Sequence, residues 1–159
     1  MEDVNQQVAE KRRLPVTPCL CAALRQASRA VTRIYDTELR ATGLRVTQFA
    51  LLSLLSRSGE VRQGDLGEMA SLDETTLTRS LRPLEKSGWV TIRAGVDRRE
   101  KLVAITEAGK EKAEQARPAW SRAQERLRRA LPDGTWDSLF AALPDVTKAA
   151  SETTSGETP

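Results

Sequence analysis

The 159-residue sequence contains no histidine, only two cysteines and few aromatic residues. Without histidine the chain cannot form a Cys/His zinc site, a Ser-His or Cys-His nucleophile pair, or an imidazole acid-base catalyst. Cys19 and Cys21 alone cannot complete a zinc site within one chain. We therefore expect no enzyme, no bound metal and no cofactor.

Long apolar runs are also missing, so the sequence predicts no membrane span. Residues 1–13 lack the apolar stretch of a secretory signal, and we expect a cytoplasmic protein with reduced thiols. The charged fraction of 30% and hydrophobic fraction of 39% are typical of a globular protein. The net charge of +3 is compatible with nucleic acid as a partner but does not establish one.

The chain length suits one small domain with an added oligomerisation element. Residues 1–17 and 151–159 are polar, have no apolar periodicity and are predicted to be flexible tails. A first helix is expected over Cys19–Ala41. Its apolar residues recur at steps of three and four, which predicts a narrow seam facing another helix: Leu20, Leu24, Ala27, Val31 and Ile34.

The middle of the chain predicts a helix-turn-helix followed by a hairpin. A densely apolar helix starts at Thr47, and a short link through Val61 and Arg62 leads to two consecutive helices, Gln63–Ala70 and Asp73–Lys86. Asp73 is a good N-cap for the second of these helices. Two short strands, Trp89–Arg93 and Leu102–Ile105, then flank a polar turn.

The last part of the chain is predicted to be helical again. Thr106 is expected to cap a long helix that Pro118 kinks. A turn at Pro132–Gly134 leads into a final helix with Trp136 and Phe140 on its apolar side.

The helix over Asp73–Lys86 carries the strongest functional signal. Its leucines share one face, while hydroxyls and cations at steps of four, three and four share another. Such a face suits the major groove, where Arg reaches base edges and Lys neutralises phosphates. The candidate DNA-contacting residues are Thr75, Thr76, Thr78, Arg79, Arg82 and Lys86. Pro83 interrupts this pattern and should loosen the last turn.

The hairpin tip is a second candidate DNA-binding element. Arg98 and Arg99, with Lys101 just beyond, give it a positive charge suited to a neighbouring minor groove. Asp97 is expected to brace Arg99 or the turn backbone.

These motifs resemble the DNA-binding core of the MarR family of transcription regulators. The resemblance rests on residues 73–90 as the recognition helix and first wing strand, on Asp97–Arg99 in the wing, and on Leu102–Gly109 at the start of the long helix. It implies a mainly α fold with a small β-hairpin wing, a winged helix-turn-helix at residues 46–105, and dimerisation helices at 18–45 and 106–150. It also implies a homodimer on a pseudo-palindromic double-stranded DNA operator, repression as the usual mode, and a small-molecule effector or redox signal.

Cys19 and Cys21 are candidate sensors. Two residues apart on a helix, their side chains lie about 200° apart, so a disulfide within the chain is not expected. Across a dimer axis the two pairs could form an intersubunit disulfide or a four-thiolate metal site. The alternative is that both are small residues packed at a helix start.

Two other functions compete with DNA binding. A winged helix can serve protein assembly instead, although that use needs no cations on both the recognition face and the wing. A thiol enzyme would need a base, and the chain offers no histidine for that role.

Overall fold

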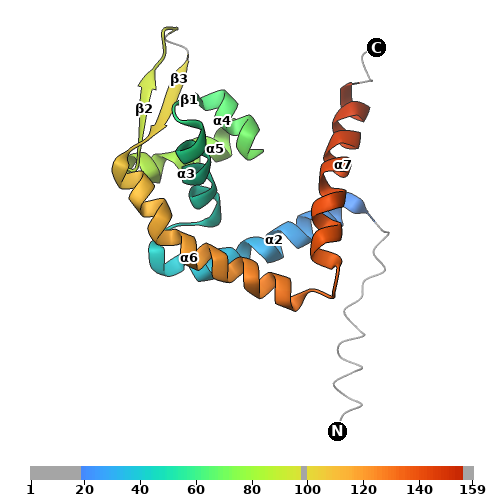
Figure 1. Ribbon diagram of the computed structural model, residues 1–159. Coiled ribbons are helices and arrows are strands. Elements are labelled where there is room, and N and C mark those ends of the chain that lie inside the picture. The colour runs from blue at the N-terminus through green and yellow to red at the C-terminus, as the bar shows by residue number, and fades with distance from the viewer. Residues whose placement is uncertain (1–18, 98–99, 156–159) are drawn as a thin grey trace, which may run out of the picture. The chain divides into compact units, whose positions relative to one another are not determined.

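The computed structural model describes residues 19–97 and 100–155. Two compact units divide the chain, Met1–Arg33 and Ile34–Pro159, and the first helix crosses the division. The predicted mainly α fold with a small hairpin is confirmed (Figure 1). In the described residues the elements are α2 (Leu20–Leu39), the 3-10 helix η1 (Arg40–Thr42), α3 (Val46–Ser58), β1 (Val61–Arg62), α4 (Gln63–Ala70), α5 (Glu74–Lys86), β2 (Val90–Ala94), β3 (Lys101–Ile105), α6 (Glu107–Ala130) and α7 (Thr135–Ser155).

The sheet has one strand more than the sequence predicts. Val61 and Arg62, expected to be a link, form β1 and pair antiparallel with Val103 and Leu102 of β3. The strand order is β1-β3-β2, so β3 lies in the centre of the sheet. Two residues are too few to show an alternating pattern, which is why the sequence gives no sign of this strand.

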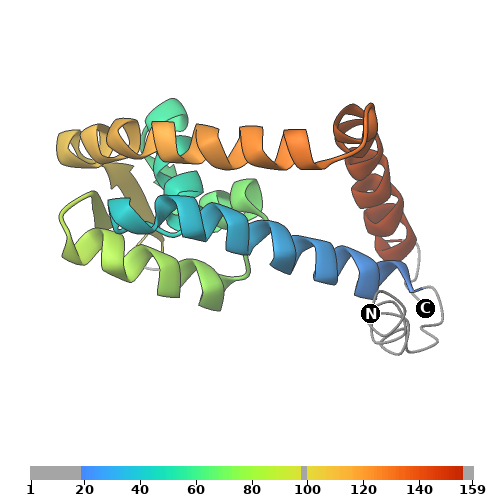
Figure 2. The same cartoon turned by 90° about the horizontal axis from the view of Figure 1, so that it is seen from below.

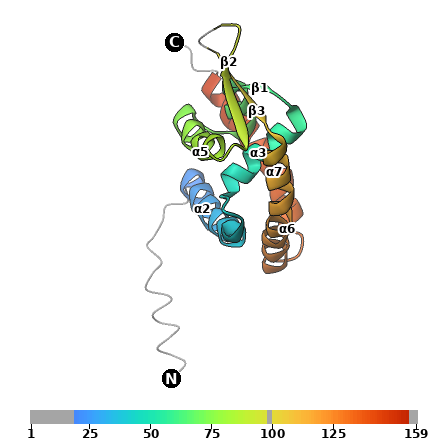
Figure 3. The same cartoon turned by 90° about the vertical axis from the view of Figure 1, so that its left-hand side faces the viewer.

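The core of the second unit surrounds α3. Its buried leucines explain the dense apolar pattern, because α3 packs against α4, α5, β3 and α6. Figure 3 shows α3 between α5 and α6. On α6 the buried positions are small, which lets this helix approach α3 closely. The fully or nearly fully buried side chains include Leu51, Leu52, Leu55, Leu77, Leu81, Leu84, Val90, Val103, Ala113, Ala116 and Ala119.

Helix α6 starts at the cap that the sequence predicts. The hydroxyl of Thr106 accepts a hydrogen bond from the backbone N–H of Gly109 at 3.1 Å and donates one to the carbonyl of Gly88 at 2.7 Å. The helix runs through Pro118 to Ala130 as one continuous element (Figure 2). Because α7 ends at Ser155, its last turn includes residues expected to belong to the C-terminal tail. No helix in the described part of the chain is long and apolar enough to cross a membrane.

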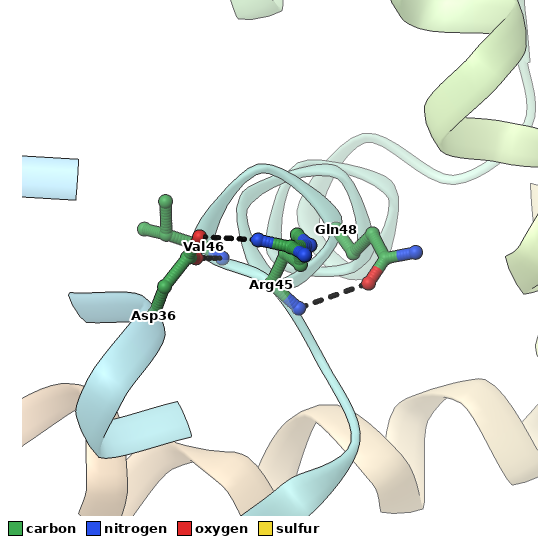
Figure 4. Close-up of polar contacts among 4 residues, drawn as sticks. All are labelled: Asp36, Arg45, Val46 and Gln48. Atoms are coloured by element: carbon green, nitrogen blue, oxygen red, sulfur yellow. Dashed lines mark hydrogen bonds and ion pairs between the residues drawn. The ribbon is translucent and has the colours of Figure 1, made fainter. Parts of the chain in front are cut away.

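The start of α3 is capped by the end of α2 (Figure 4). Asp36 Oδ1 accepts a hydrogen bond from the backbone N–H of Val46 at 2.8 Å, and its Oδ2 lies 3.1 Å from Arg45 Nη1. The backbone N–H of Arg45 donates to Gln48 Oε1 at 2.9 Å. Two otherwise unpaired N–H groups at this helix start are thereby satisfied.

Candidate nucleic-acid interface

Helix α5 begins with the predicted cap at Asp73. Its Oδ1 accepts from the backbone N–H of Thr76 at 2.9 Å, and its Oδ2 accepts from the Thr76 hydroxyl at 2.6 Å. The hydroxyl hydrogen bond is the largest cause that lowers the pKa of the Asp73 carboxyl. Thr76 is half-buried and its proton is engaged in the cap, which sets it apart from the other hydroxyls of the predicted face. The spacing Asp73-x-x-Thr76 could have indicated this role from the sequence.

The remaining predicted residues of α5 lie on one exposed surface. Leu77, Leu81 and Leu84 are buried on the opposite side and fix the rotation of the helix. A shallow hollow of about 420 Å³ on the exposed side brings together Glu74, Thr75, Thr78, Arg79, Arg82 and Pro83. None of the three cations Arg79, Arg82 and Lys86 forms an ion pair with another described residue. Their charges are therefore available to an anionic partner.

Helix α5 continues through Pro83 as far as Lys86. The carbonyl of Pro83 accepts a hydrogen bond from the N–H of Ser87 at 3.0 Å, so the last turn remains closed despite the missing proline donor. Lys86 is the final residue of the helix and is exposed. The helix thus extends as far as the sequence predicts.

Gln63 is a candidate that sequence reasoning missed. It is the first residue of α4, and its Nε2 donates to the Thr78 hydroxyl oxygen at 3.4 Å. A threonine that accepts one hydrogen bond can turn its own proton towards an outside acceptor. Gln63 therefore influences how Thr78 presents its hydroxyl.

The wing consists of β2, β3 and the turn between them. Asp97 and Lys101 are exposed, whereas Arg98 and Arg99 lie outside the described residues. The Asp97 carbonyl accepts from the N–H of Glu100 at 2.9 Å, and the N–H of Gly95 donates to the Glu100 carbonyl at 2.8 Å. These hydrogen bonds close the turn. The predicted bracing of Arg99 by Asp97 stays a prediction.

A pocket of about 430 Å³ lies between α3, the end of α4 and α6. Phe49 and Trp120 stack with ring centroids 5.9 Å apart beside it. Arg57 and Arg117 supply the charged part of its wall, and Arg117 forms a two-bond pair with Glu114 at 2.6 and 3.0 Å. This pair is the main cause that lowers the pKa of Glu114. No sequence motif marks the pocket because three separate helices form it.

Both cysteines are exposed free thiols. Cys19 immediately precedes α2, and its carbonyl accepts from the N–H of Ala23 at 3.0 Å. Cys21 Sγ lies 3.4 Å from Arg25 Nη2. Within the residues that the structure describes, no group of three or more potential ligands could hold a metal ion.

Comparison with known proteins identifies the class of this chain. Residues 44–101 match the sequence model described as the MarR family. The HTH-type transcriptional regulator YwoH of Bacillus subtilis is 30% identical over 104 residues, which cover 65% of this chain and 76% of YwoH. The organic hydroperoxide resistance transcriptional regulator of the same organism is 35% identical over 98 residues, which cover 59% of this chain and 67% of that protein.

A solved structure supports the same class. The Mycobacterium tuberculosis transcriptional regulator MosR, in a complex with DNA, superimposes with a TM-score of 0.76 at 30% identity. The match covers 86% of this chain and 98% of the MosR chain. The protein described here belongs to the MarR family and is a transcription regulator.

Proposed function

We propose that this protein is a homodimeric repressor whose α5 reads the major groove of a pseudo-palindromic operator while the wing contacts the adjacent groove. The observation that carries the proposal is the exposed face of α5, where Thr75, Thr78, Arg79 and Arg82 line one surface. Lys101 is the first residue of β3, next to the turn of the wing, and is also exposed. We include Arg98 and Arg99 in the proposed wing contact because of their positions in the sequence, since both lie outside the described residues.

The direct test selects duplexes from a random pool with the purified protein and measures the affinity of the enriched sequence. We expect tight, salt-sensitive binding and weak binding to a scrambled duplex. Replacement Arg79→Ala should weaken specific binding by about 10- to 100-fold, which corresponds to about 1–3 kcal/mol. The matched control is Arg128→Ala, which removes an exposed cation from α6. Failure to enrich any sequence would contradict the proposal and favour the protein-assembly alternative.

Exposed apolar side chains support the homodimer. In α7, Leu139, Phe140 and Leu143 are 44%, 61% and 42% exposed, and in α2 Leu20 and Val31 are also exposed. A monomer rarely leaves this much large apolar surface to water on consecutive helix turns. We assign these faces to contacts with a second copy of the chain.

The oligomeric state can be tested on α7. Phe140→Asp should convert a dimer into a monomer in light scattering, because it buries a carboxylate in an apolar interface. Ala141→Asp places the same charge at least about 100° around the helix from Leu139, Phe140 and Leu143, and should leave the dimer intact. A wild-type monomer at micromolar concentration would contradict the assignment.

We further propose that oxidation of Cys19 or Cys21 releases the operator. Both thiols are exposed, and one of the relatives is by name a regulator of organic hydroperoxide resistance. Cumene hydroperoxide should lower operator affinity in the wild type and not in a Cys19→Ser, Cys21→Ser double variant. Equal behaviour of the two proteins would exclude a thiol sensor and direct attention to the pocket beside Phe49 and Trp120 as a small-molecule site.

A further inference from the structure

Strand β1 connects the wing to the helix-turn-helix. Its two residues pair with β3 on one side, and at Arg62 they lead directly into α4. The orientation of the β2–β3 hairpin relative to α4 and α5 is thus set by β1 together with the direct contacts of β2 with α5 and of β3 with α3 and α4. Two residue pairs are a short ladder for that purpose.

An ion pair crosses the central strand and reinforces this ladder. Arg93 of β2 donates from Nη2 to Glu60 Oε1 at 2.6 Å and from Nε to Glu60 Oε2 at 2.8 Å. Glu60 directly precedes β1, so the pair joins the two outer strands of the sheet over β3. A two-bond contact between a guanidinium and a carboxylate fixes orientation as well as distance.

A second ion pair joins the neighbouring strands β1 and β3. Arg62 Nε of β1 lies 3.4 Å from Oε1 of Glu100, the residue before β3. Arg62, Leu102 and Arg93 occupy one row across the sheet, so both arginines leave the same face. Each arginine pairs with a glutamate that directly precedes another strand.

The negative charges of Glu60 and Glu100 beside the wing need an explanation if the wing binds DNA. A carboxylate beside a DNA-binding wing repels phosphates and lowers the affinity for any duplex. Exposed ion pairs also contribute little to global stability, and Arg93 is 60% exposed in its side chain. Neither general DNA attraction nor overall stability accounts for Glu60, whereas wing orientation does.

We propose that Glu60 and Arg93 are a positioning pair that sets the wing relative to α5, so that both elements meet one operator half-site in register. Arg93 acts here through Glu60 and not as a phosphate contact. The inference rests on the proposed function, because it assumes that α5 and the wing both touch DNA.

The direction of the change caused by one substitution separates positioning by Glu60 from a general effect of its charge. Glu60→Gln removes a negative charge, so a pure charge effect would raise affinity for every duplex. If Glu60 positions the wing, Glu60→Gln should instead lower the affinity for the selected operator by about fivefold. A loss of this size is expected when the coupling between two parts of an interface is disturbed. Affinity for a scrambled duplex should stay equal or rise.

Arg93→Gln gives an independent readout. If Arg93 only positions the wing, the dependence of operator affinity on salt should keep its slope while affinity falls. A phosphate contact by Arg93 would instead lower the slope by about one. The double reversal Glu60→Arg, Arg93→Glu should restore operator affinity to within about twofold of the wild type.

The chain offers a matched control. Glu114 and Arg117 form the same two-bond contact, with 2.6 and 3.0 Å, within α6. Glu114→Gln should leave operator affinity unchanged. If the wild type binds its operator and Glu60→Gln binds it equally well or more tightly, the positioning role is wrong. If the wild type binds no operator, the proposed function itself is wrong.

Discussion

The carboxylate of Asp36 caps a helix that begins ten residues later. Its Oδ1 lies 2.8 Å from the backbone nitrogen of Val46, the first residue of α3 (Figure 4). Arg45 occupies the N-cap position and has no side-chain acceptor to offer. The start of α3 is thus held by a residue of α2.

Asp36→Ala should lower the free energy of unfolding by about 1 kcal/mol, because it leaves the Val46 N–H without its acceptor. Arg45→Ala removes only the exposed partner of Asp36 and should cost less than about 0.5 kcal/mol. Urea denaturation of both variants checks the difference. Equal losses of unfolding free energy in the two variants would mean that the Asp36–Arg45 ion pair, and not the helix cap, stabilises the junction between α2 and α3.

Two helical glycines should respond oppositely to alanine. A Cβ on Gly109 would overlap the carbonyl oxygen of Trp89 and lie 2.8 Å from Ile105 Cγ1, whereas a Cβ on Gly64 would meet no atom within 4 Å. Gly109→Ala should therefore cost about 1–3 kcal/mol, and Gly64→Ala should be neutral or stabilising by up to about 1 kcal/mol. Thermal unfolding distinguishes them; a stable Gly109→Ala protein would show that Trp89 can move away.

The cap at Asp73 should make the stability of α5 depend on pH. Because hydrogen bonds from Thr76 lower the pKa of Asp73 from its ordinary value of 3.8, folding favours the ionised form. The stabilisation is complete above that ordinary value and disappears as the pH falls through the lower pKa of the folded state. The stability difference between wild type and Asp73→Ala should consequently be larger at pH 7 than at pH 3. A difference independent of pH would argue against ionisation as its source.

Pro83 stands inside α5 although its nitrogen cannot donate to the preceding turn. Pro83→Ala restores that donor and should raise the free energy of unfolding by up to about 3 kcal/mol. Circular dichroism and denaturation measure the change. A less stable variant would indicate that the turn has a shape which only proline maintains.

Short-range signals predicted much of the fold. The caps at Asp73 and Thr106, the buried leucines of α5 and its exposed cations all depend on residues three or four positions apart, and the structure places them as expected. The sequence groups Thr76 with the hydroxyls predicted to contact DNA, because the spacing of residues along a helix shows only which side chains share a face. Which hydroxyl is engaged by the cap depends on the rotamer that Asp73 adopts.

Long-range features remained hidden. The Glu60–Arg93 pair joins residues 33 positions apart, and the Asp36 cap depends on how α2 turns into α3. The pocket beside Trp120 needs three helices in place before it exists. Such contacts follow from tertiary packing, for which the sequence provides no periodic signal.

The two-residue strand β1 also determines which parts of this protein can be exchanged with those of a relative. Without it, β3 would become an outer strand with a row of unpaired backbone groups, a surface that invites pairing with other chains. A fragment that contains α5 and the hairpin without β1 would carry this exposed edge. The smallest transferable unit therefore begins before α4, at Glu60, and a new DNA specificity has to be moved together with the strand that holds its wing.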